Sequence, residues 1–236
     1  MIARPSHALQ DDLVTANRIL FDQKIVDGFG HISARNDADP TTFVMSQYVA
    51  PGLVETSDLR VFDFTSTALE NDGARHYSER YIHGAIYAAR PDVQSVIHCH
   101  AAPLLPFGVS RNATLKPVFH MCGFLGAGAR VFEIRETAGM TDMLIRTPER
   151  GAALAADLGS DPIILMRGHG ATMVGASIKQ VVYRSVYAAQ NATVQMQAIA
   201  LGDVTYLSEE EAALFEGHAT GTFERPWSIW KREALG

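Results

Sequence analysis

The sequence predicts an α/β fold built from packed layers, and three observations carry this prediction. Apolar residues recur at helical spacing in three segments, short runs with one apolar face lie between them, and turns rich in Gly, Asp, Asn and Pro separate the two kinds of segment. The chain has 236 residues, of which 47% are hydrophobic and 19% charged, so it can bury a sizeable core. No linker, repeat or shift in composition divides it, and we expect one domain over residues 1–236.

The first helix is expected over residues 8–27, where Leu9, Leu13, Ala16 and Leu20 follow a helical period up to Gly28. A second is expected over residues 78–90, because its apolar positions repeat at i, i+3, i+4 and i+7 before Pro91 ends the pattern. A third, long helix is expected over residues 177–201. These helices supply the α layers of the predicted fold.

Strands are expected over residues 28–35, 42–45, 61–64, 93–100 and 162–166. The segment 93–100 alternates well enough to bury one face, whereas 162–166 is apolar throughout and is expected to be buried on both. A turn is expected after it, over residues 167–170. Helices and strands thus alternate along the chain, as a layered α/β domain requires.

Composition excludes several functions. The chain has 20 Lys and Arg against 26 Asp and Glu, a net charge of −6, which argues against nucleic acid as a partner. No apolar run approaches the roughly 18 to 20 residues of a membrane span, and residues 1–12 lack the apolar core of a signal peptide. Two cysteines, Cys99 and Cys122, do not make a disulfide framework. These features predict a reduced, cytoplasmic protein.

Two histidines share one face of an expected strand. In Val96-Ile97-His98-Cys99-His100, alternation places both imidazoles on the same side, about 6.6 Å apart along the backbone. They could therefore reach one cation, whereas Cys99 points the other way and is expected to pack in the core.

Two further groups suit the same cation. His169 lies between glycines in Arg167-Gly168-His169-Gly170, at the end of a buried strand, where sites in α/β proteins are common. Glu79 is expected in the first turn of the helix over 78–90, on its inward face, where a carboxylate without a partner would be costly. Three imidazoles and one carboxylate favour zinc, manganese or iron over magnesium or calcium.

With these candidate ligands and the motifs around them, the chain resembles the class II aldolase and adducin-head family. The resemblance covers nearly the whole chain through GFGHISARN, SERYIHGAIYAARPDVQSVIHCHA, LMRGHGATMVG and a helix ending in ALG before LSEEEA. It implies a three-layer α/β/α domain with a mostly antiparallel central sheet. It also implies one catalytic divalent metal per subunit, Mn²⁺ or Zn²⁺, held by Glu79, His98, His100 and His169.

The departures from the sugar-phosphate aldolases of this family concern phosphate binding. Those enzymes have an asparagine where this chain has His31, a Thr-Gly turn where it has Met45-Ser46-Gln47, and paired serines where it has Tyr77-Ser78. A phosphate bound to this chain would therefore find fewer neutral hydrogen-bond donors than in those aldolases. The chain is more similar to the branch that decarboxylates hydroxylated aromatic or pyridine carboxylates, such as 3-hydroxy-2-methylpyridine-4,5-dicarboxylate in vitamin B6 breakdown.

The expected function is therefore a metal-dependent carboxy-lyase that acts through a metal-stabilised enolate. Glu79 is the expected acid: it would leave the metal as the substrate enters, and burial would then raise its pKa. His31 is a second catalytic candidate. His31 and Ser78 are expected to contact the substrate. The substrate carboxylates are expected to pair with one of three arginines: Arg35, Arg75 and Arg167.

Two alternatives use the same fold. The first is an aldolase or epimerase acting on a small hydroxy carbonyl compound or sugar phosphate. The second is a non-catalytic interaction module like adducin, although that branch lacks the full metal set. The resemblance also implies a cyclic homotetramer with sites near subunit interfaces. Trp227 and Trp230 could reach a neighbouring subunit or cover the chain's own core.

Overall fold

A seven-stranded sheet runs through the middle of the molecule. The computed structural model describes residues 2–219 and 222–236. The strand order is β3-β2-β1-β4-β7-β6-β5, and every neighbouring pair is antiparallel except β5 and β6. The strands are β1 (His31–Arg35), β2 (Thr42–Ser46), β3 (Leu59–Asp63), β4 (Ser95–Cys99), β5 (Arg130–Phe132), β6 (Ile163–Met166) and β7 (Gly170–Gly175). The expected mostly antiparallel sheet is confirmed.

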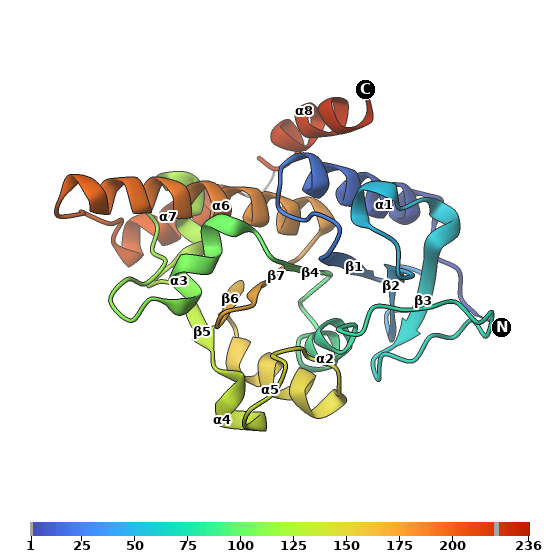
Figure 1. The fold of residues 1–236 in the computed structure, drawn as a ribbon. Helices are drawn as coiled ribbons and strands as arrows, with labels where there is room; N and C mark the ends of the chain where they lie inside the picture. The colour runs from blue at the N-terminus through green and yellow to red at the C-terminus, as the bar shows by residue number, and fades with distance from the viewer. Residues whose placement is uncertain (1, 220–221) are drawn as a thin grey trace.

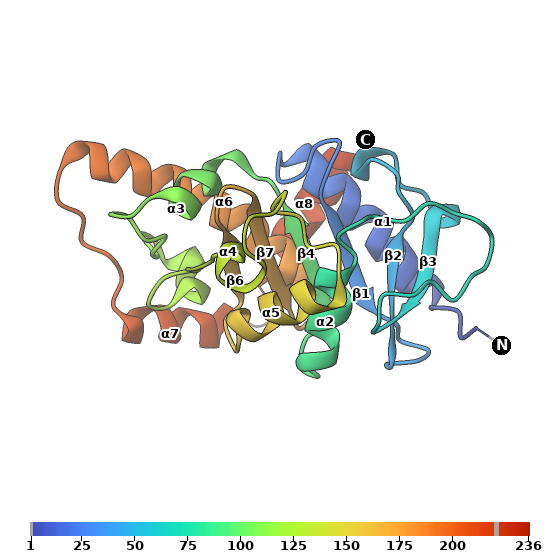
Figure 2. The same ribbon diagram turned by 60° about the horizontal axis from the view of Figure 1, so that its bottom comes forward.

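Helices cover both faces of this sheet. Figure 1 shows α1, α6 and α8 on one face and α2, α4 and α5 on the other, and Figure 2 brings the second group forward. The helices are α1 (His7–Asp22), α2 (Tyr81–Ala89), α3 (Leu105–Val109), α4 (Ile134–Ala138), α5 (Pro148–Leu158), α6 (Ile178–Leu201), α7 (Glu209–Ala219) and α8 (Glu224–Leu235). The expected three-layer α/β/α architecture is confirmed.

Two apolar clusters fill the spaces between the layers. Successive side chains of β4 point to opposite faces, so Ile97 packs in the cluster with α1 and α6 while Val96 packs in the cluster with α2 and α5. Trp227 and Trp230 of α8 belong to the first cluster and are only 5% and 8% exposed. Of the two possibilities for these tryptophans, the structure shows that they cover the chain's own core.

Several element boundaries differ from expectation. The helix α1 ends at Asp22 rather than Asp27, because Gln23 caps it and Lys24 adopts a left-handed φ of 60°. The helix α2 begins at Tyr81, three residues later than expected, so Glu79 lies in the turn before it. The strands β5 and β7 were not predicted. The strand β5 has only three residues, and β7 is rich in small residues. β5 pairs with β6 and β7 pairs with β4, and both partners are distant in sequence.

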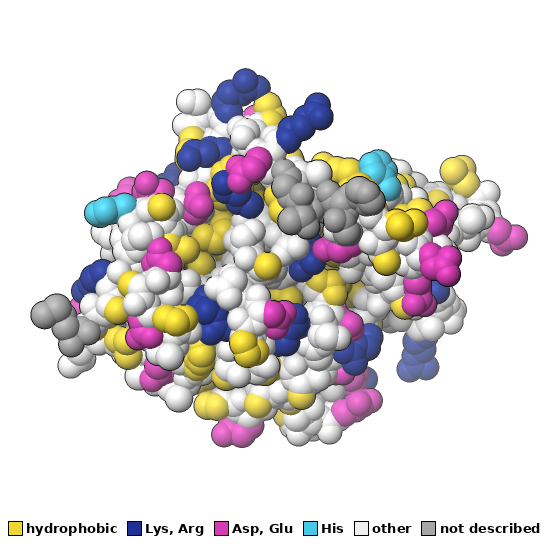
Figure 3. Space-filling view, turned by 180° about the vertical axis from the view of Figure 1, so that it is seen from behind, with side chains coloured by type: hydrophobic (Ala, Val, Ile, Leu, Met, Phe, Trp, Pro, Cys, Tyr) yellow, Lys and Arg dark blue, Asp and Glu magenta, His cyan; other side chains and the backbone are white. Residues whose placement is uncertain are grey.

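The surface and the cysteines agree with the composition. Acidic and basic side chains are interspersed on the face seen in Figure 3. Both Cys99 and Cys122 are buried and free. Within residues 2–219 and 222–236, no helix has the length and apolar character that crossing a membrane requires.

Candidate metal centre and substrate cavity

Glu79, His98, His100 and His169 come together at one end of the central strands. Each offers one ligand atom, and these four atoms all lie within 4.8 Å of one another. His98 comes from β4, His100 directly follows that strand, His169 lies in the hairpin between β6 and β7, and Glu79 precedes α2. Antiparallel pairing of β4 with β7 is what places the hairpin beside the two histidines.

His98 and His100 lie on the same side of the backbone, as alternation predicts. Their Nε2 atoms are 3.1 Å apart, and their ring centroids are 4.9 Å apart. Cys99 between them is completely buried in the opposite core. The two imidazoles therefore converge on one point.

The hairpin that carries His169 depends on its glycines. Gly168 has a φ of 63°, a conformation that favours glycine, and a side chain at Gly170 would clash with the carbonyl oxygen of Cys99. Nδ1 of His169 lies 3.0 Å from the carbonyl oxygen of Met143, so Nδ1 carries the proton and donates it. Nε2 then presents a lone pair, and this buried atom has no hydrogen-bond partner in the protein.

Glu79 is held by one backbone donor and lies beside two of the imidazoles. Its Oε1 accepts a hydrogen bond of 2.8 Å from the backbone N–H of Ile145, and its Oε2 lies 3.6 Å from Nε2 of His98 and 3.4 Å from Nε2 of His169. Burial opposes ionisation, but His98, His169 and the Ile145 N–H together hold the pKa of Glu79 well below its usual range. In this arrangement the carboxyl group is ionised, and a role as an acid would require it to leave these neighbours.

This set of donors fits a divalent metal ion. Burial lowers the pKa of His98 to about 3 and also lowers the pKa of His100, so both imidazoles are neutral near pH 7 and keep lone pairs for coordination. The unpartnered Nε2 of His169 points to the same use. Nitrogen-rich sites with one carboxylate suit zinc, manganese and iron.

A cavity of about 490 Å³ opens directly beside these four residues. This volume falls within the range of ligand sites, roughly 300 to 1,000 Å³. Its apolar walls come from Phe29, Tyr48, Tyr77, Met143 and Leu144. The cavity is therefore shaped by aromatic rings on one side and by the loop before α5 on the other.

His31 and Ser78 both line this cavity. His31 starts β1, directly opposite His98 in the strand register, and its ring centroid lies 5.3 Å from that of His98 and 4.7 Å from that of Tyr77. Ser78 is exposed at the turn before Glu79. Both candidates thus lie where a bound molecule could touch them.

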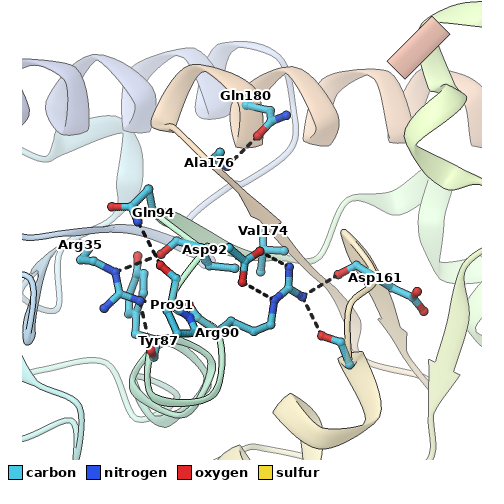
Figure 4. Close-up of polar contacts among 12 residues, drawn as sticks. Arg35, Tyr87, Arg90, Pro91, Asp92, Gln94, Asp161, Val174, Ala176 and Gln180 are labelled. Carbon is cyan, nitrogen blue, oxygen red and sulfur yellow. Dashed lines mark hydrogen bonds and ion pairs between the residues drawn. The ribbon is translucent and has the colours of Figure 1, made fainter. Parts of the chain in front are cut away.

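The three candidate arginines have different surroundings. Arg35 donates to the backbone carbonyls of Pro40, Tyr87, Arg90 and Val93, and Figure 4 shows it beside Tyr87. It does not line the cavity. Arg167 forms an ion pair with Glu133 and also lies outside the cavity lining. Arg75 lies 4.1 Å from the ring centroid of Tyr48, a cavity residue. The guanidinium of Arg75 is therefore next to the cavity wall.

Sequence reasoning missed most of the cavity wall. Met143 and Leu144 belong to a loop more than 40 residues from His98 in sequence, and nothing local marks them as site residues. Phe29 carries a weak signal in the sequence, because it stands between Gly28 and Gly30 directly before an expected strand. In the structure it is 61% exposed.

Comparison with known proteins identifies the family. Residues 11–196 match the family described as Class II Aldolase and Adducin N-terminal domain. The chain belongs to this family. The matched residues include the four cluster residues and every residue that lines the cavity.

Two curated relatives are decarboxylases. Decarboxylase tropJ of Talaromyces stipitatus is 34% identical over 93% of this chain and 91% of its own length. The 3,4-dihydroxyphthalate decarboxylase of Arthrobacter keyseri is 26% identical over 82% of this chain and 79% of its own length. A solved structure, the L-fuculose 1-phosphate aldolase of Glaciozyma antarctica, superimposes with a TM-score of 0.77 over 96% of this chain and 88% of its own, at 23% identity. Within its family, the chain is thus related to carbon–carbon lyases.

Proposed function

We propose that this protein is a divalent-metal-dependent decarboxylase of hydroxylated aromatic carboxylates, with a benzene or pyridine ring. The observation that carries the proposal is the cluster of three imidazoles and one carboxylate beside an aromatic-walled cavity. Two relatives, decarboxylase tropJ and 3,4-dihydroxyphthalate decarboxylase, are named for the same class of reaction, which supports the proposal.

The four cluster residues would hold the ion, with Mn²⁺ or Zn²⁺ as the best matches to the donors. When bound, a divalent ion supplies a Lewis acid for an oxygen on which negative charge develops as the carbon–carbon bond breaks. The carboxylate of Glu79 is already ionised and oriented by the Ile145 N–H, so it serves as a ligand without reorganisation. It would act as an acid only after taking up a proton.

The walls of the cavity suit a flat ring. Tyr48 and Tyr77 lie with their ring centroids 5.7 Å apart, and Met143 lies across the same cavity. Aromatic and thioether groups favour stacked or edge contacts with an aromatic substrate and exclude water from it. The imidazole of His31 and the hydroxyl of Ser78 are placed to contact the polar substituents of that ring.

A second carboxylate on the substrate would find its partner in Arg75. Arg35 donates to four backbone carbonyls and Arg167 pairs with Glu133, whereas Arg75 stacks on Tyr48, a residue of the cavity wall. A modest movement of its exposed side chain would bring the guanidinium toward a bound dicarboxylate. We therefore assign the recognition of that group to Arg75.

The alternative is an aldolase or epimerase acting on a small hydroxy carbonyl compound or a sugar phosphate. The structural similarity to L-fuculose 1-phosphate aldolase supports the fold of such an enzyme. A phosphate, however, is poorly served, because the Tyr77 hydroxyl already donates to the carbonyl of Val49 and Ser46 is only 1% exposed.

A metal analysis coupled to a substrate screen tests the proposal. Protein loaded with Mn²⁺ or Zn²⁺ should release carbon dioxide from hydroxylated benzene or pyridine carboxylates, such as 3,4-dihydroxyphthalate or 3-hydroxy-2-methylpyridine-4,5-dicarboxylate. Chelated protein should not. Faster cleavage of L-fuculose 1-phosphate than of every hydroxy acid would favour the aldolase alternative. Absence of bound metal and of any turnover would favour a non-catalytic, adducin-like module.

We further propose that the protein is a homotetramer with its sites near subunit interfaces, as the family resemblance implies. The position of the cavity supports this, because Phe29 and Tyr48 are 61% and 43% exposed at its rim and would be covered by a neighbour. Light scattering of the purified protein measures the subunit number directly.

A further inference from the structure

A row of four buried polar side chains runs from the core to the wall of the cavity. Tyr87 OH lies 2.8 Å from Oγ of Ser33, which lies 2.6 Å from Nδ1 of His83. Nε2 of His83 lies 2.7 Å from Nδ1 of His31, which lines the cavity. All four side chains are at most 5% exposed. The row therefore connects the interior of the protein to the candidate site without a contact to bulk water.

The hydrogen atoms along this row have one arrangement that leaves no donor unused. Among the described residues, Oγ of Ser33 is the hydrogen-bond acceptor within reach of the Tyr87 hydroxyl hydrogen, so Tyr87 donates to Ser33. Ser33 accepts from Tyr87, so its hydrogen goes to Nδ1 of His83. If His83 donated from Nδ1 instead, the Ser33 hydrogen would be buried without an acceptor.

The same reasoning fixes both histidines. Burial lowers the pKa of His83 to about 3, so the ring is neutral and carries one hydrogen. Since its Nδ1 accepts from Ser33, that hydrogen is on Nε2 and is donated to Nδ1 of His31. The hydrogen of a neutral His31 is then on Nε2, the nitrogen that His83 leaves free for the cavity.

We propose that Tyr87, Ser33 and His83 are positioning residues that hold His31 in its Nε2–H tautomer, so that this N–H donates to an oxygen of the substrate. The assignment of the acceptor rests on the proposed function, whereas the tautomer does not. The acceptor would be a carboxylate or phenolate oxygen, because the His31 ring lies within 5.3 Å of the His98 ring, next to the metal cluster. A fixed donor at this place favours substrates with an oxygen substituent beside the departing carboxylate.

Side-chain nitrogen NMR tests the tautomer without reference to activity. Long-range correlations between nitrogen and carbon-bound hydrogens, recorded on ¹⁵N-histidine-labelled full-length protein with Zn²⁺, distinguish Nδ1–H from Nε2–H rings. We expect His31 as Nε2–H in the wild type. Ser33→Ala and Tyr87→Phe should shift a measurable fraction of His31 toward Nδ1–H, because His83 then loses its fixed direction. Tyr183→Phe is the matched control, since it removes a buried hydroxyl that contacts no residue of the row.

Kinetics provide the second readout. Ser33→Ala should lower kcat on a hydroxylated aromatic carboxylate about 10-fold or more, with a smaller change in KM. His83→Gln keeps one amide donor for His31 and should retain more activity than His83→Leu. An Nδ1–H ring in wild-type His31, or a tautomer that Ser33→Ala leaves unchanged, overturns the proposal. If the wild type releases no carbon dioxide, the proposed function fails, but the NMR result still decides the tautomer.

Discussion

The Nε2 atoms of His98, in β4, and of His100, which directly follows that strand, lie 3.1 Å apart. The Nε2 lone pair of His169 is directed to the same place, because its Nδ1–H is committed to the Met143 carbonyl. Three imidazoles that converge in this way are preorganised, so metal binding requires little rearrangement.

Replacing His98 with alanine should remove the metal. Two imidazoles and Glu79 would remain, and loss of one buried nitrogen ligand weakens binding enough for dialysis to strip the ion. We expect about one equivalent of divalent metal in the wild type and well under half of that in His98→Ala, as measured by elemental analysis. His7→Ala, which changes an exposed histidine of α1, should keep the wild-type content. Full occupancy in His98→Ala would contradict the assignment.

Replacing Glu79 with glutamine separates binding from turnover. Three imidazoles remain, so the protein should stay folded and keep much of its metal. Turnover should nevertheless fall by roughly 10² to 10⁴ if the carboxylate handles a proton or balances the metal charge. Metal content and kcat measured on the same preparation test this. Normal turnover in Glu79→Gln would show that Glu79 has no part in the reaction, and the acid role would then pass to His31.

The sequence predicts the ligand set far better than the cavity around it. The same-face position of His98 and His100 follows from strand alternation, and the glycines around His169 mark a close approach of two backbones. Both are local properties. Met143, which orients His169, comes from a distant loop, and no local pattern marks a carbonyl as a hydrogen-bond acceptor for a histidine.

The choice among the arginines also required tertiary structure. Arg35, Arg75 and Arg167 have equal charge in the sequence, and their roles are separated by their partners in the fold. Four carbonyls hold Arg35 and Glu133 holds Arg167, whereas Arg75 contacts the ring of a cavity tyrosine. In the same way, three-residue β5 is too short to be recognised without its partner β6.

Arg75→Gln should affect substrates according to their charge. For a dicarboxylate such as 3,4-dihydroxyphthalate, loss of the guanidinium should raise KM about 10-fold, equivalent to about 1.4 kcal/mol. A monocarboxylate with the same ring hydroxyls should be affected much less. Arg167→Gln serves as the control, because that side chain is paired with Glu133 away from the cavity. Equal changes in KM for both substrates would show that Arg75 does not bind the second carboxylate.

Gly170→Ala should disturb the metal cluster through the backbone next to His100. The added methyl group would clash with the carbonyl oxygen of Cys99 and lie 2.9 Å from Cδ2 of His100. We expect a loss of about 1 to 3 kcal/mol in stability, since overpacking forces local shifts, together with weaker metal binding because His100 is displaced. Denaturant unfolding and metal titration measure the two effects. Gly28→Ala is the matched control, because a methyl group there meets no atom within 4 Å. Equal stability and metal affinity for both variants would show that the hairpin tolerates the displacement.

Acid should destabilise the metal-free protein through buried histidines. The folded-state pKa of His83 is lowered by burial to about 3, against an ordinary value of 6.5. Between these two pH values His83 is protonated in the unfolded chain but not in the folded protein. The contribution of His83 to the free energy of unfolding is therefore fully present above pH 6.5 and is lost as the pH is lowered toward 3.

The slope of this loss can be assigned to His83. Each such histidine contributes up to about 1.4 kcal/mol per pH unit, and His98 contributes in the same direction. We expect His83→Gln to show a shallower dependence of unfolding free energy on pH between 4.5 and 6.5, measured by urea denaturation in the presence of a chelator. Glu79 is present in both proteins, so its titration contributes equally to the two curves and does not explain a difference between their slopes. His7→Gln should reproduce the wild-type slope, because His7 is exposed. Parallel curves for His83→Gln and the wild type would mean that His83 takes up its proton in the folded state, and that the buried row from Tyr87 to His31 is not held neutral.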